Sequence, residues 1–396
     1  MIPLNKVSPA IPKSTQIRFI VAISPVQKLL EAVITPFLMS YAIENLSDKQ
    51  RGFIAEMTTH HNITDILNPD NKGKEILLID FASAFDTIDR RKLYDVLVSR
   101  DILPPAITNL LLFIHTNSLI KLGAHTIQTR KGVPQGSLIS PLLFNIYIAE
   151  LLDLMSSFGL TKAFADDIGI ALNKDRNTED AIDVVVNWTN QNSMQLNRSK
   201  SGILSKRKPA GQNIKGIPVC AKYKYLGVVI DSNLNTGPHI NYLRQTLYKR
   251  CLRIMHLSKS NTLQQRMILL KTLILPIANY AKPGTDAAKY RNHNEQLAAV
   301  RRKCTRLVLS LGQNTKNVLV NAIISSNLKN LTPEIIHLIN TFNRSKCKLH
   351  RKRLSTTHLK QNHFINISYT DIEKAIIEGK NQKICHMLKL ILTISV

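Results

Sequence analysis

Residues 161–172 read TKAFADDIGIAL, in which two apolar arms flank a pair of adjacent carboxylates, Asp166 and Asp167. This pattern predicts a β-hairpin with both acids at its tip. A single aspartate at a strand end is usually a solvated loop residue. Two adjacent like charges, however, cost free energy unless a cation compensates them. The pair therefore favours a cation-binding site over a solvated turn.

A second carboxylate, Asp80, ends an apolar run upstream. Residues 75–80 read EILLID and follow the turn-forming NPDNKG of residues 68–73, so they predict a buried strand. Two metal ions ~3.5–4 Å apart need carboxylates from separate elements that converge on one edge of a sheet. Mg²⁺ prefers such oxygen ligands and completes its octahedron with water and substrate phosphates. Asp80, Asp166 and Asp167 therefore suit a two-metal site.

The remaining pattern predicts an α+β region and then an all-α region, with the boundary near residue 236. Helical periodicity marks residues 90–100 and 107–115. An apolar helix is predicted to open with Ser140 as N-cap and Pro141 as its first residue, and to run to about Met155. Residues 178–194 predict an amphipathic helix capped by Asn177 or Thr178, and short strands are predicted at 201–204 and 224–231.

Positive charge is concentrated in the second part of the chain. The sequence holds 53 Lys and Arg against 27 Asp and Glu, a net charge of +26. Residues 1–235 carry 26 basic and 21 acidic side chains, whereas residues 236–396 carry 27 basic and 6 acidic ones. Lysine and arginine gain affinity for a polyanion by releasing counterions condensed on its phosphates. The surplus favours a nucleic-acid partner over a merely solvated basic surface.

The five cysteines lie far apart without a C-x-x-C pair, which argues against a disulfide scaffold or a zinc finger. The sequence shows no signal peptide, and no apolar run is expected to approach the ~18 residues that cross a bilayer. The expectation is a soluble intracellular protein, in the nucleus, the cytoplasm or both, with no membrane partner.

Six blocks in order resemble the reverse transcriptases of non-LTR, LINE-type retrotransposons. The first block, which precedes the palm, consists of RFIVAI, KLLE and QRGF (residues 18–23, 28–31 and 50–53). The other five are DFASAFD (80–86), GVPQGSLISPLLFNIY (132–147), FADD (164–167), Trp188 with LNRSK (196–200), and YLG (225–227). One block alone is weak evidence, but six in the expected order across residues 16–235 are strong. Phe164 before the two acids and the run Ala84-Phe85-Asp86 favour the LINE type over a group II intron or retron-type polymerase.

The resemblance implies a right-hand polymerase, α+β with an antiparallel sheet in fingers and palm, followed by an all-α basic thumb and C-terminal region. The implied segments are fingers at 1–75, a palm with the catalytic site at 76–235, a helical thumb at 236–310 and a basic helical region at 311–396. The implied activity is RNA-directed DNA polymerisation, in which a DNA primer 3′-hydroxyl attacks a dNTP on an RNA template. The implied cofactors are two Mg²⁺ ions, with Mn²⁺ as a substitute.

The resemblance also implies a role for each site residue. Asp80, Asp166 and Asp167 would bind the metals, and Lys200 would lie near the leaving pyrophosphate as a candidate general acid. Contacts to the dNTP and the template–primer would come from Arg18 at the triphosphate, Phe81, Phe85 as the steric gate against a 2′-hydroxyl, Gln135 and Gly136 in the nucleotide and template pocket, and Tyr225, Leu226 and Gly227 at the primer end. Phe85 as a core aromatic and Lys200 as a solvated turn lysine are the open alternatives, and Trp188 is expected to be a core residue rather than a base-stacking platform.

The sequence departs from the family pattern in two ways. Ile54 follows Gly52-Phe53, where the family often has a basic residue, so either Arg51 substitutes or triphosphate binding is weaker. No endonuclease domain is recognisable, which predicts a fragment of a longer element protein or a polymerase without its own nuclease. A catalytically impaired relic that only binds nucleic acid therefore stays open as the alternative function. The template RNA, the DNA target and the oligomeric state are not named by any motif.

The basic second part has helical spacing. Leu243, Leu247, Leu252 and Met255 are predicted to form one buried face, with Arg244, Lys249, Arg250 and Arg253 outside it. As a thumb, this basic face would follow the template–primer backbone, because phosphate contacts position a duplex without reading its sequence. The basic clusters at residues 301–303 and 344–353 suit RNA tethering or a nuclear-localisation signal.

Overall fold

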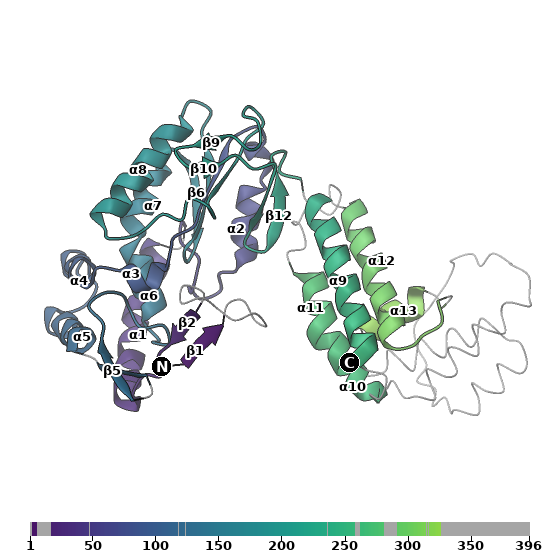
Figure 1. Ribbon diagram of the computed structural model, residues 1–396, viewed down its shortest axis with the longest axis horizontal. Helices are drawn as coiled ribbons and strands as arrows, with labels where there is room; N and C mark the ends of the chain where they lie inside the picture. Colours follow the sequence, from purple (N-terminus) through teal and green to yellow (C-terminus); the bar gives the residue numbers. More distant parts are fainter. Residues whose placement is uncertain are drawn as a thin grey trace, which may run out of the picture. The chain divides into compact units, whose positions relative to one another are not determined.

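The structure is a computed structural model that describes residues 2–5, 17–46, 48–117, 119–122, 124–235, 237–257, 262–280, 291–313, 315 and 317–325 (Figure 1). The chain divides into two compact units, Met1–Pro238 and His239–Val396, and each is considered by itself. The basic cluster predicted at residues 344–353 lies outside the described residues, and the division into fingers, palm, thumb and C-terminal region stays a prediction.

A four-stranded antiparallel sheet lies at the centre of the first unit. Its strand order is β6 (Gly159–Phe164), β7 (Asp167–Leu172), β3 (Ile76–Ile79) and β8 (Gly202–Leu204). All four residues of β3 are buried, which confirms the strand predicted there. The hairpin predicted from residues 161–172 is also confirmed, since β6 and β7 pair in register up to Phe164 opposite Asp167.

Helices cover both faces of this sheet, with α7 and α8 on one side and α2 on the other (Figure 1). This two-sided cover explains why β3 and most of β7 are apolar throughout instead of alternating. The helices of the first unit are α1 (Pro25–Asn45), α2 (Thr59–Ile66), the 3₁₀ turn η2 (Pro69–Asn71), α3 (Ala84–Thr87), α4 (Arg90–Ser99), α5 (Pro105–Asn117), α6 (Ser140–Tyr147), α7 (Ala149–Ser156) and α8 (Thr178–Gln191).

The described residues of the first unit also form four two-stranded antiparallel sheets: β1 (Ile2–Asn5) with β2 (Ile17–Ile20), β4 (Leu119–Leu122) with β5 (His125–Gln128), β9 (Asn213–Ile214) with β10 (Ile217–Pro218), and β11 (Lys222–Tyr225) with β12 (Val228–Asp231). The single strand predicted at residues 224–231 is therefore wrong. Leu226 and Gly227 adopt positive φ of 44° and 82°, and this left-handed pair reverses the chain between β11 and β12.

The helix predicted from Ser140 to Met155 is also different in detail. It is interrupted at Ile148, which separates α6 from α7, and the N-cap position belongs to Ile139. Ser137 supplies the capping hydroxyl instead, because its Oγ accepts from the backbone N–H groups of Ile139 and Ser140, both at 3.3 Å. By contrast, the cap predicted at Asn177 is confirmed, since its side chain accepts from the N–H of Glu179 at 3.1 Å.

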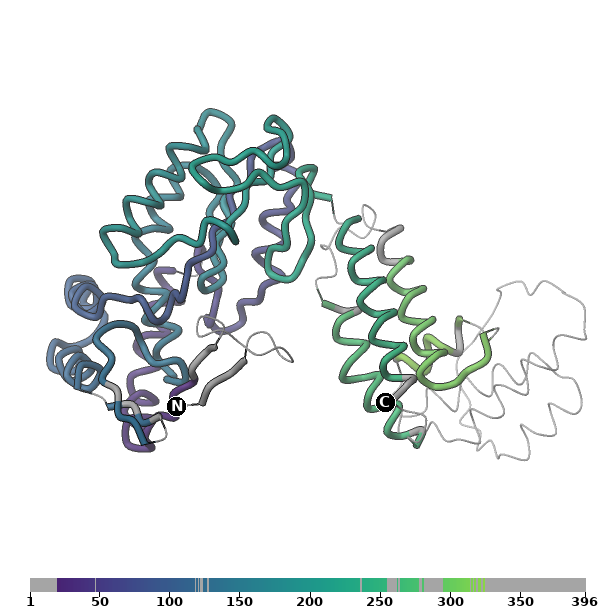
Figure 2. Tube along the Cα trace, viewed as in Figure 1, coloured from purple at the N-terminus to yellow at the C-terminus, as the bar shows by residue number. Residues whose placement is uncertain are grey.

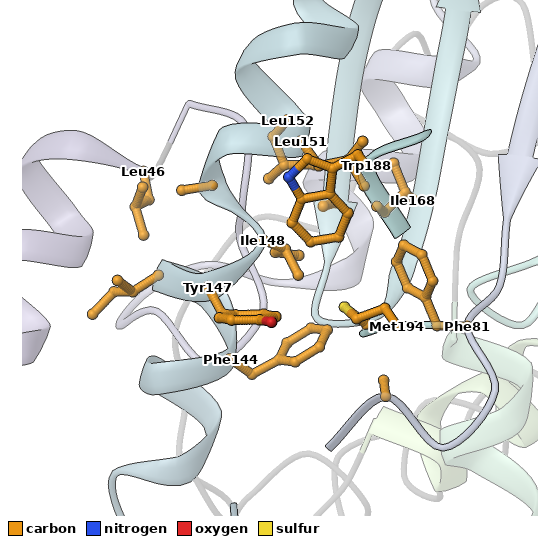
Figure 3. Close-up of a cluster of buried hydrophobic side chains, with 14 of the residues drawn as sticks. Leu46, Phe81, Phe144, Tyr147, Ile148, Leu151, Leu152, Ile168, Trp188 and Met194 are labelled. Carbon is orange, nitrogen blue, oxygen red and sulfur yellow. The ribbon is translucent and has the colours of Figure 1, made fainter. Parts of the chain in front are cut away.

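The largest hydrophobic core of the described residues lies between α6, α7, α8 and the sheet (Figure 3). Phe144, Ile148 and Leu151 are fully buried there. Trp188 is 2% exposed, and its indole N–H donates to Glu150 Oε2 at 2.9 Å. The prediction that Trp188 is a core residue is therefore confirmed. Burying one such side chain stabilises the fold by roughly 1.5–3 kcal/mol.

Among the described residues, α1 is the one helix long and apolar enough to cross a membrane by length and composition. Lys28 and Glu31 interrupt its apolar run in the sequence. Leu38 and Ala42 are fully buried in the core, and buried Glu31 accepts from Gln27 and from the N–H of Leu138. One apolar face of α1 thus packs against the protein core, so the apolar residues on that face are explained by this packing.

The elements that the structure describes in the second unit are helical: α9 (Gly237–Leu257), α10 (Leu263–Leu269), the π-helical turn η3 (Leu270–Ile274), α11 (Leu275–Asn279), α12 (Arg291–Val308) and α13 (Asn317–Ser325). Helices α9 and α12 lie side by side (Figure 2), and Lys303 Nζ lies 5.2 Å from the ring centroid of Tyr248. Ile240, Leu243 and Leu297 form a small core between them.

The buried face of α9 differs from the predicted one. Leu243 and Leu247 are buried as predicted, but Leu252 is 46% exposed, and Cys251 and Ile254 are buried instead. At about 100° per residue, position 252 points to the side of the helix opposite position 243, whereas positions 247, 251 and 254 stay near it. The side chain of Met255 lies outside the described residues. The four basic residues predicted outside this face, Arg244, Lys249, Arg250 and Arg253, are all exposed.

Candidate catalytic site

Three carboxylates meet at one edge of the central sheet. Strand β3 ends at Ile79, which pairs with Ile168 near the start of the antiparallel strand β7. Asp80 directly follows the last residue of β3, and Asp167 is the first residue of the neighbouring antiparallel strand β7, so both lie at the same edge of the sheet. Asp166 lies between them in the turn of the β6–β7 hairpin, after Ala165, whose φ is 55°. The fold thus gathers acids from two separate segments of the chain.

These carboxylates disturb one another electrostatically. Loss of hydration, followed by the charges of Asp166 and Asp80, raises the pKa of Asp167 to about 6. Burial and the charge of Asp166 raise the pKa of Asp80, while Lys200 and a hydrogen bond from Asn197 oppose that shift. Asp80 Oδ2 is buried and lacks a hydrogen-bond partner among the described residues. A bound cation stabilises an uncompensated cluster of this kind, because it favours the ionised carboxylates.

The donor set fits a hydrated divalent cation. Within the described ranges no group of three or more His, Cys, Asp or Glu side chains is drawn close enough to hold an ion as it stands. Mg²⁺ usually keeps several waters and binds one or two carboxylates together with substrate phosphates, so a finished protein cage is not required. The orphaned Asp80 Oδ2 and the mutual repulsion of the three acids are the features that such an ion relieves.

Lys200 lies close enough to Asp80 for its charge to lower the pKa of that carboxyl, and its side chain is exposed. Residues on either side of Lys200 fix the backbone of Asp80 in place. The backbone N–H of Asn197 donates to the Asp80 carbonyl at 2.9 Å, and the Asp80 N–H donates to Ser201 Oγ at 3.1 Å. Tyr223 donates to the Lys200 carbonyl at 2.6 Å. The segment around residues 196–201 therefore holds the backbone of Asp80, the first residue of the block DFASAFD, in position.

The segment from Gly132 to Gly136 lies beside a cavity of about 790 Å³. Gln135 and Asp86 line this cavity, and Gln135 Nε2 donates to Asp86 Oδ1 at 3.1 Å. Gly136 has φ +125°, and a Cβ there would lie 2.4 Å from the carbonyl oxygen of Val21. The close approach that requires this glycine is thus made to the protein's own backbone, not to a ligand. The Val21 N–H donates to the Gln135 carbonyl at 2.7 Å.

The two phenylalanines of the block DFASAFD differ in exposure. Phe81 is 4% exposed and lies in the core cluster of Figure 3, which favours a packing role. Phe85 is half-buried and stacks on Phe144, with ring centroids 4.9 Å apart. It directly precedes Asp86, which is exposed beside the cavity. Phe85 therefore makes a core contact, and the neighbouring Asp86 rather than Phe85 itself lines the cavity.

The predicted primer-end residues form the β11–β12 turn. Tyr225 is 2% exposed, and its hydroxyl donates to the Lys162 carbonyl at 3.3 Å. Burial raises the pKa of Tyr225. Leu226 is also buried, whereas Gly227 is half-buried. Tyr225 thus packs against the hairpin that carries the acids.

The predicted triphosphate contacts are placed only in part. Arg18 lies in β2, and its side chain is outside the described residues. Arg51 NH1 forms an ion pair with Asp65 at 2.8 Å, so this guanidinium is already engaged. Ile54 is 4% exposed and belongs to the core. Neither Arg51 nor Ile54 therefore offers a free positive charge.

Arg90 is a site residue that the sequence did not reveal. It is 7% exposed, and its guanidinium donates to the carbonyls of Gly132, His115, Thr129 and Lys131 and to the Thr129 hydroxyl, at 2.7–3.0 Å. These bonds fix the loop that leads into Gln135. Only its place at the start of a helix was visible in the sequence, because the partners are 25 to 42 residues away.

Comparison with known proteins gives a consistent result. The profile of the family described as "Reverse transcriptase (RNA-dependent DNA polymerase)" matches residues 11–230. A "Probable RNA-directed DNA polymerase from transposon X-element" of Drosophila melanogaster is 27% identical over 196 residues, 45% of this chain and 21% of the relative. A "Retrovirus-related Pol polyprotein from type-1 retrotransposable element R2" of Popillia japonica is 26% identical over 293 residues, 64% of this chain and 46% of the relative. The chain thus spans less than half the length of either relative.

Among solved structures, telomerase from Candida albicans in complex with a fragment of telomeric RNA is similar at a TM-score of 0.42 and 12% identity. The similarity covers 80% of this chain and 57% of that one, and it is too weak to carry an argument about the fold. The predicted resemblance to non-LTR retrotransposon polymerases is confirmed by the family profile and the transposon relatives.

Proposed function

Because the chain belongs to the reverse transcriptase (RNA-dependent DNA polymerase) family, we propose that it is an RNA-directed DNA polymerase of a non-LTR retrotransposon. Its substrates are a dNTP, an RNA template and the 3′-hydroxyl of a DNA primer or target. The observation that carries the proposal is the meeting of Asp80, Asp166 and Asp167 at one sheet edge, where Asp80 Oδ2 has no hydrogen-bond partner in the part of the chain that the structure describes.

In this proposal the chemistry is nucleotidyl transfer. Asp80, Asp166 and Asp167 would hold two divalent ions, Mg²⁺ or Mn²⁺, at the sheet edge. When bound, these ions would lower the pKa of the 3′-hydroxyl and stabilise the negative charge of the leaving pyrophosphate. Asn197 and Ser201 keep Asp80 in position through its backbone. The acids must be ionised to hold the ions, and without a cation burial and the charges of Asp166 and Asp80 raise the pKa of Asp167 to about 6.

Other residues bind and orient the substrates. Lys200, exposed near Asp80, donates a proton to the leaving pyrophosphate. Phe85 lies under the incoming sugar as the gate against a 2′-hydroxyl, and Gln135 faces the nucleotide and template from the cavity wall. Arg18 contacts the triphosphate, and the β11–β12 turn positions the primer end. The basic face of α9 follows the duplex backbone, which fits an intracellular protein, nuclear or cytoplasmic, that encounters RNA.

Primer extension on an RNA template tests the proposal. The wild-type chain and an Asp166→Ala, Asp167→Ala double variant receive Mg²⁺ and dNTPs, and template–primer affinity is measured in parallel at several salt concentrations. Extension by the wild type alone, with equal affinity in both proteins, supports the polymerase and its metal site together.

A second candidate function is a relic that binds nucleic acid without extending it. The engaged Arg51 and the buried Ile54 favour it, because both leave the triphosphate with fewer positive contacts. Binding by both proteins without extension by either selects this candidate.

A further inference from the structure

Gln50 forms hydrogen bonds to both backbone groups of the residue that precedes the catalytic acids. Its side-chain Oε1 accepts from the N–H of Ala165 at 2.8 Å, and its Nε2 donates to the Ala165 carbonyl at 3.0 Å. The same Oε1 accepts from the Gly52 N–H at 2.8 Å. Gln50 is completely buried.

The turn needs an external partner to keep its shape. Ala165 has φ 55°, a left-handed conformation that costs a non-glycine residue free energy and persists only where the surroundings enforce it. Ala165 is 6% exposed, so its N–H and carbonyl have little access to water. The last strand pair of the hairpin is Phe164 with Asp167, which leaves both groups of Ala165 outside the β6–β7 ladder. Gln50 satisfies both.

The segment around Gln50 is attached to the hairpin along its length. β6 is an edge strand of the sheet, and the N–H of Ala163 donates to the Lys49 carbonyl at 2.7 Å while the N–H of Arg51 donates to the Ala163 carbonyl at 2.9 Å. A Cβ on Gly52 would lie 2.2 Å from the backbone nitrogen of Ala165, so only glycine allows this approach. The carbonyl of Gly52 accepts from Asn145 Nδ2 at 2.6 Å.

We propose that Gln50 is a positioning residue for nucleotide addition. It fixes the peptide groups of Ala165 so that Asp166 and Asp167 reach the edge where Asp80 lies. It touches neither a substrate nor a metal and acts only through the turn. The inference rests on the proposed metal site, because it concerns the placement of that site's ligands. Residues that hold metal ligands in place typically change metal affinity or activity by 10–100-fold when they are replaced.

The test compares two isosteric replacements of buried amides. Gln50→Met removes the bonds to Ala165 and keeps the side-chain length. Asn71→Leu is the matched control, since Asn71 is 2% exposed and its side-chain N–H groups donate to the backbone carbonyls of Asp65 and Ile66, away from the turn. Gln50→Glu keeps an acceptor for both N–H groups but loses the donor to the Ala165 carbonyl, and it remains informative if Gln50→Met fails to fold.

Three measurements are made on each protein in parallel with thermal unfolding. They are the rate of single-nucleotide addition against Mg²⁺ concentration, Mn²⁺ binding by electron paramagnetic resonance, and amide hydrogen exchange in a peptide covering residues 161–168. For Gln50→Met we expect faster amide exchange at the turn and Mn²⁺ affinity that is lower by about tenfold or more. The half-saturating Mg²⁺ concentration should rise, and template–primer affinity should stay unchanged. Gln50→Glu is expected to fall between wild type and Gln50→Met.

Asn71→Leu is expected to lose stability without these changes. Equal metal binding and equal turn exchange in Gln50→Met and Asn71→Leu, at matched stability, would overturn the inference and leave Gln50 with a structural role only. The metal-binding and exchange measurements do not depend on turnover. A wild-type protein that binds Mn²⁺ without extending a primer would therefore refute the proposed function and still decide the role of Gln50.

Discussion

Replacing Arg90 by methionine removes a buried guanidinium that binds four backbone carbonyls and one hydroxyl. Burial lowers the pKa of Arg90 from its ordinary value, but the group stays charged at neutral pH. In the described residues no carboxylate forms an ion pair with it, so the dipoles of backbone carbonyls and of the Thr129 hydroxyl compensate its charge. Methionine fills a similar volume without a donor.

The loss of stability in Arg90→Met depends on which carbonyls are left without any hydrogen-bond donor, from the protein or from water. Gly132 and His115 are buried, whereas Thr129 and Lys131 can reach solvent. Leaving a buried acceptor unsatisfied costs about 1–3 kcal/mol, so two cost about 2–6 kcal/mol. Relief from burying a charge offsets part of this. We expect a net loss of about 3 kcal/mol in the free energy of unfolding.

Urea unfolding of Arg90→Met and Arg91→Met measures this loss. Arg91 is the exposed neighbour on the same helix, and its replacement is expected to change stability by less than about 0.5 kcal/mol. The loop that carries Gln135 should also loosen, so the KM for dNTP should rise more than kcat falls. Equal stability of the two variants would show that the guanidinium does not hold the loop, and the argument would be wrong.

Three further predictions concern other parts of the chain. Burial, with a smaller contribution from Arg90, lowers the pKa of His115 to about 4 from 6.5. The stability present above pH 6.5 should therefore fall by about 3 kcal/mol toward pH 4, because the unfolded state binds the proton first. The free energy of unfolding measured against pH checks this, and an unchanged pH profile in His115→Gln would contradict it. Phe85→Ala should reduce discrimination against rNTPs by on the order of 10²-fold in competition assays, and undiminished discrimination would leave Phe85 as a core aromatic. Arg250→Gln with Arg253→Gln should lower the slope of log affinity against log salt by about one to two for template–primer binding, and an unaltered slope would remove this face of α9 from the interface.

The parts of the fold that were predictable from the sequence depend on local periodicity. The apolar run before Asp80, the paired arms around Asp166-Asp167 and the cap at Asn177 each appear in the sequence within a few residues of the feature they specify. The family resemblance rested on whole blocks of such local patterns.

Features that depend on distant partners were not predictable in this way. Gln50 reaches Ala165 across 115 positions and Arg90 binds carbonyls far along the chain, so the family block that contains Gln50 and the helix that begins at Arg90 did not reveal these partners. The turn at Leu226-Gly227 was missed because apolar residues on both sides resemble one strand. The prediction for Leu252 was wrong because it counted aliphatic residues without applying the 100° step, which puts position 252 half a turn away from Leu243.

The most direct test of the account is the rate of single-nucleotide addition on an RNA template against Mg²⁺ concentration, for wild type and Asp80→Asn. Asparagine preserves the shape of Asp80, whose Oδ2 has no partner in the described residues, and removes its charge. The account predicts saturable Mg²⁺ dependence in the wild type and a rate lower by about 10²-fold or more in the variant, at equal template–primer affinity. An Asp80→Asn protein that adds nucleotides at the wild-type rate with the wild-type Mg²⁺ dependence would contradict it.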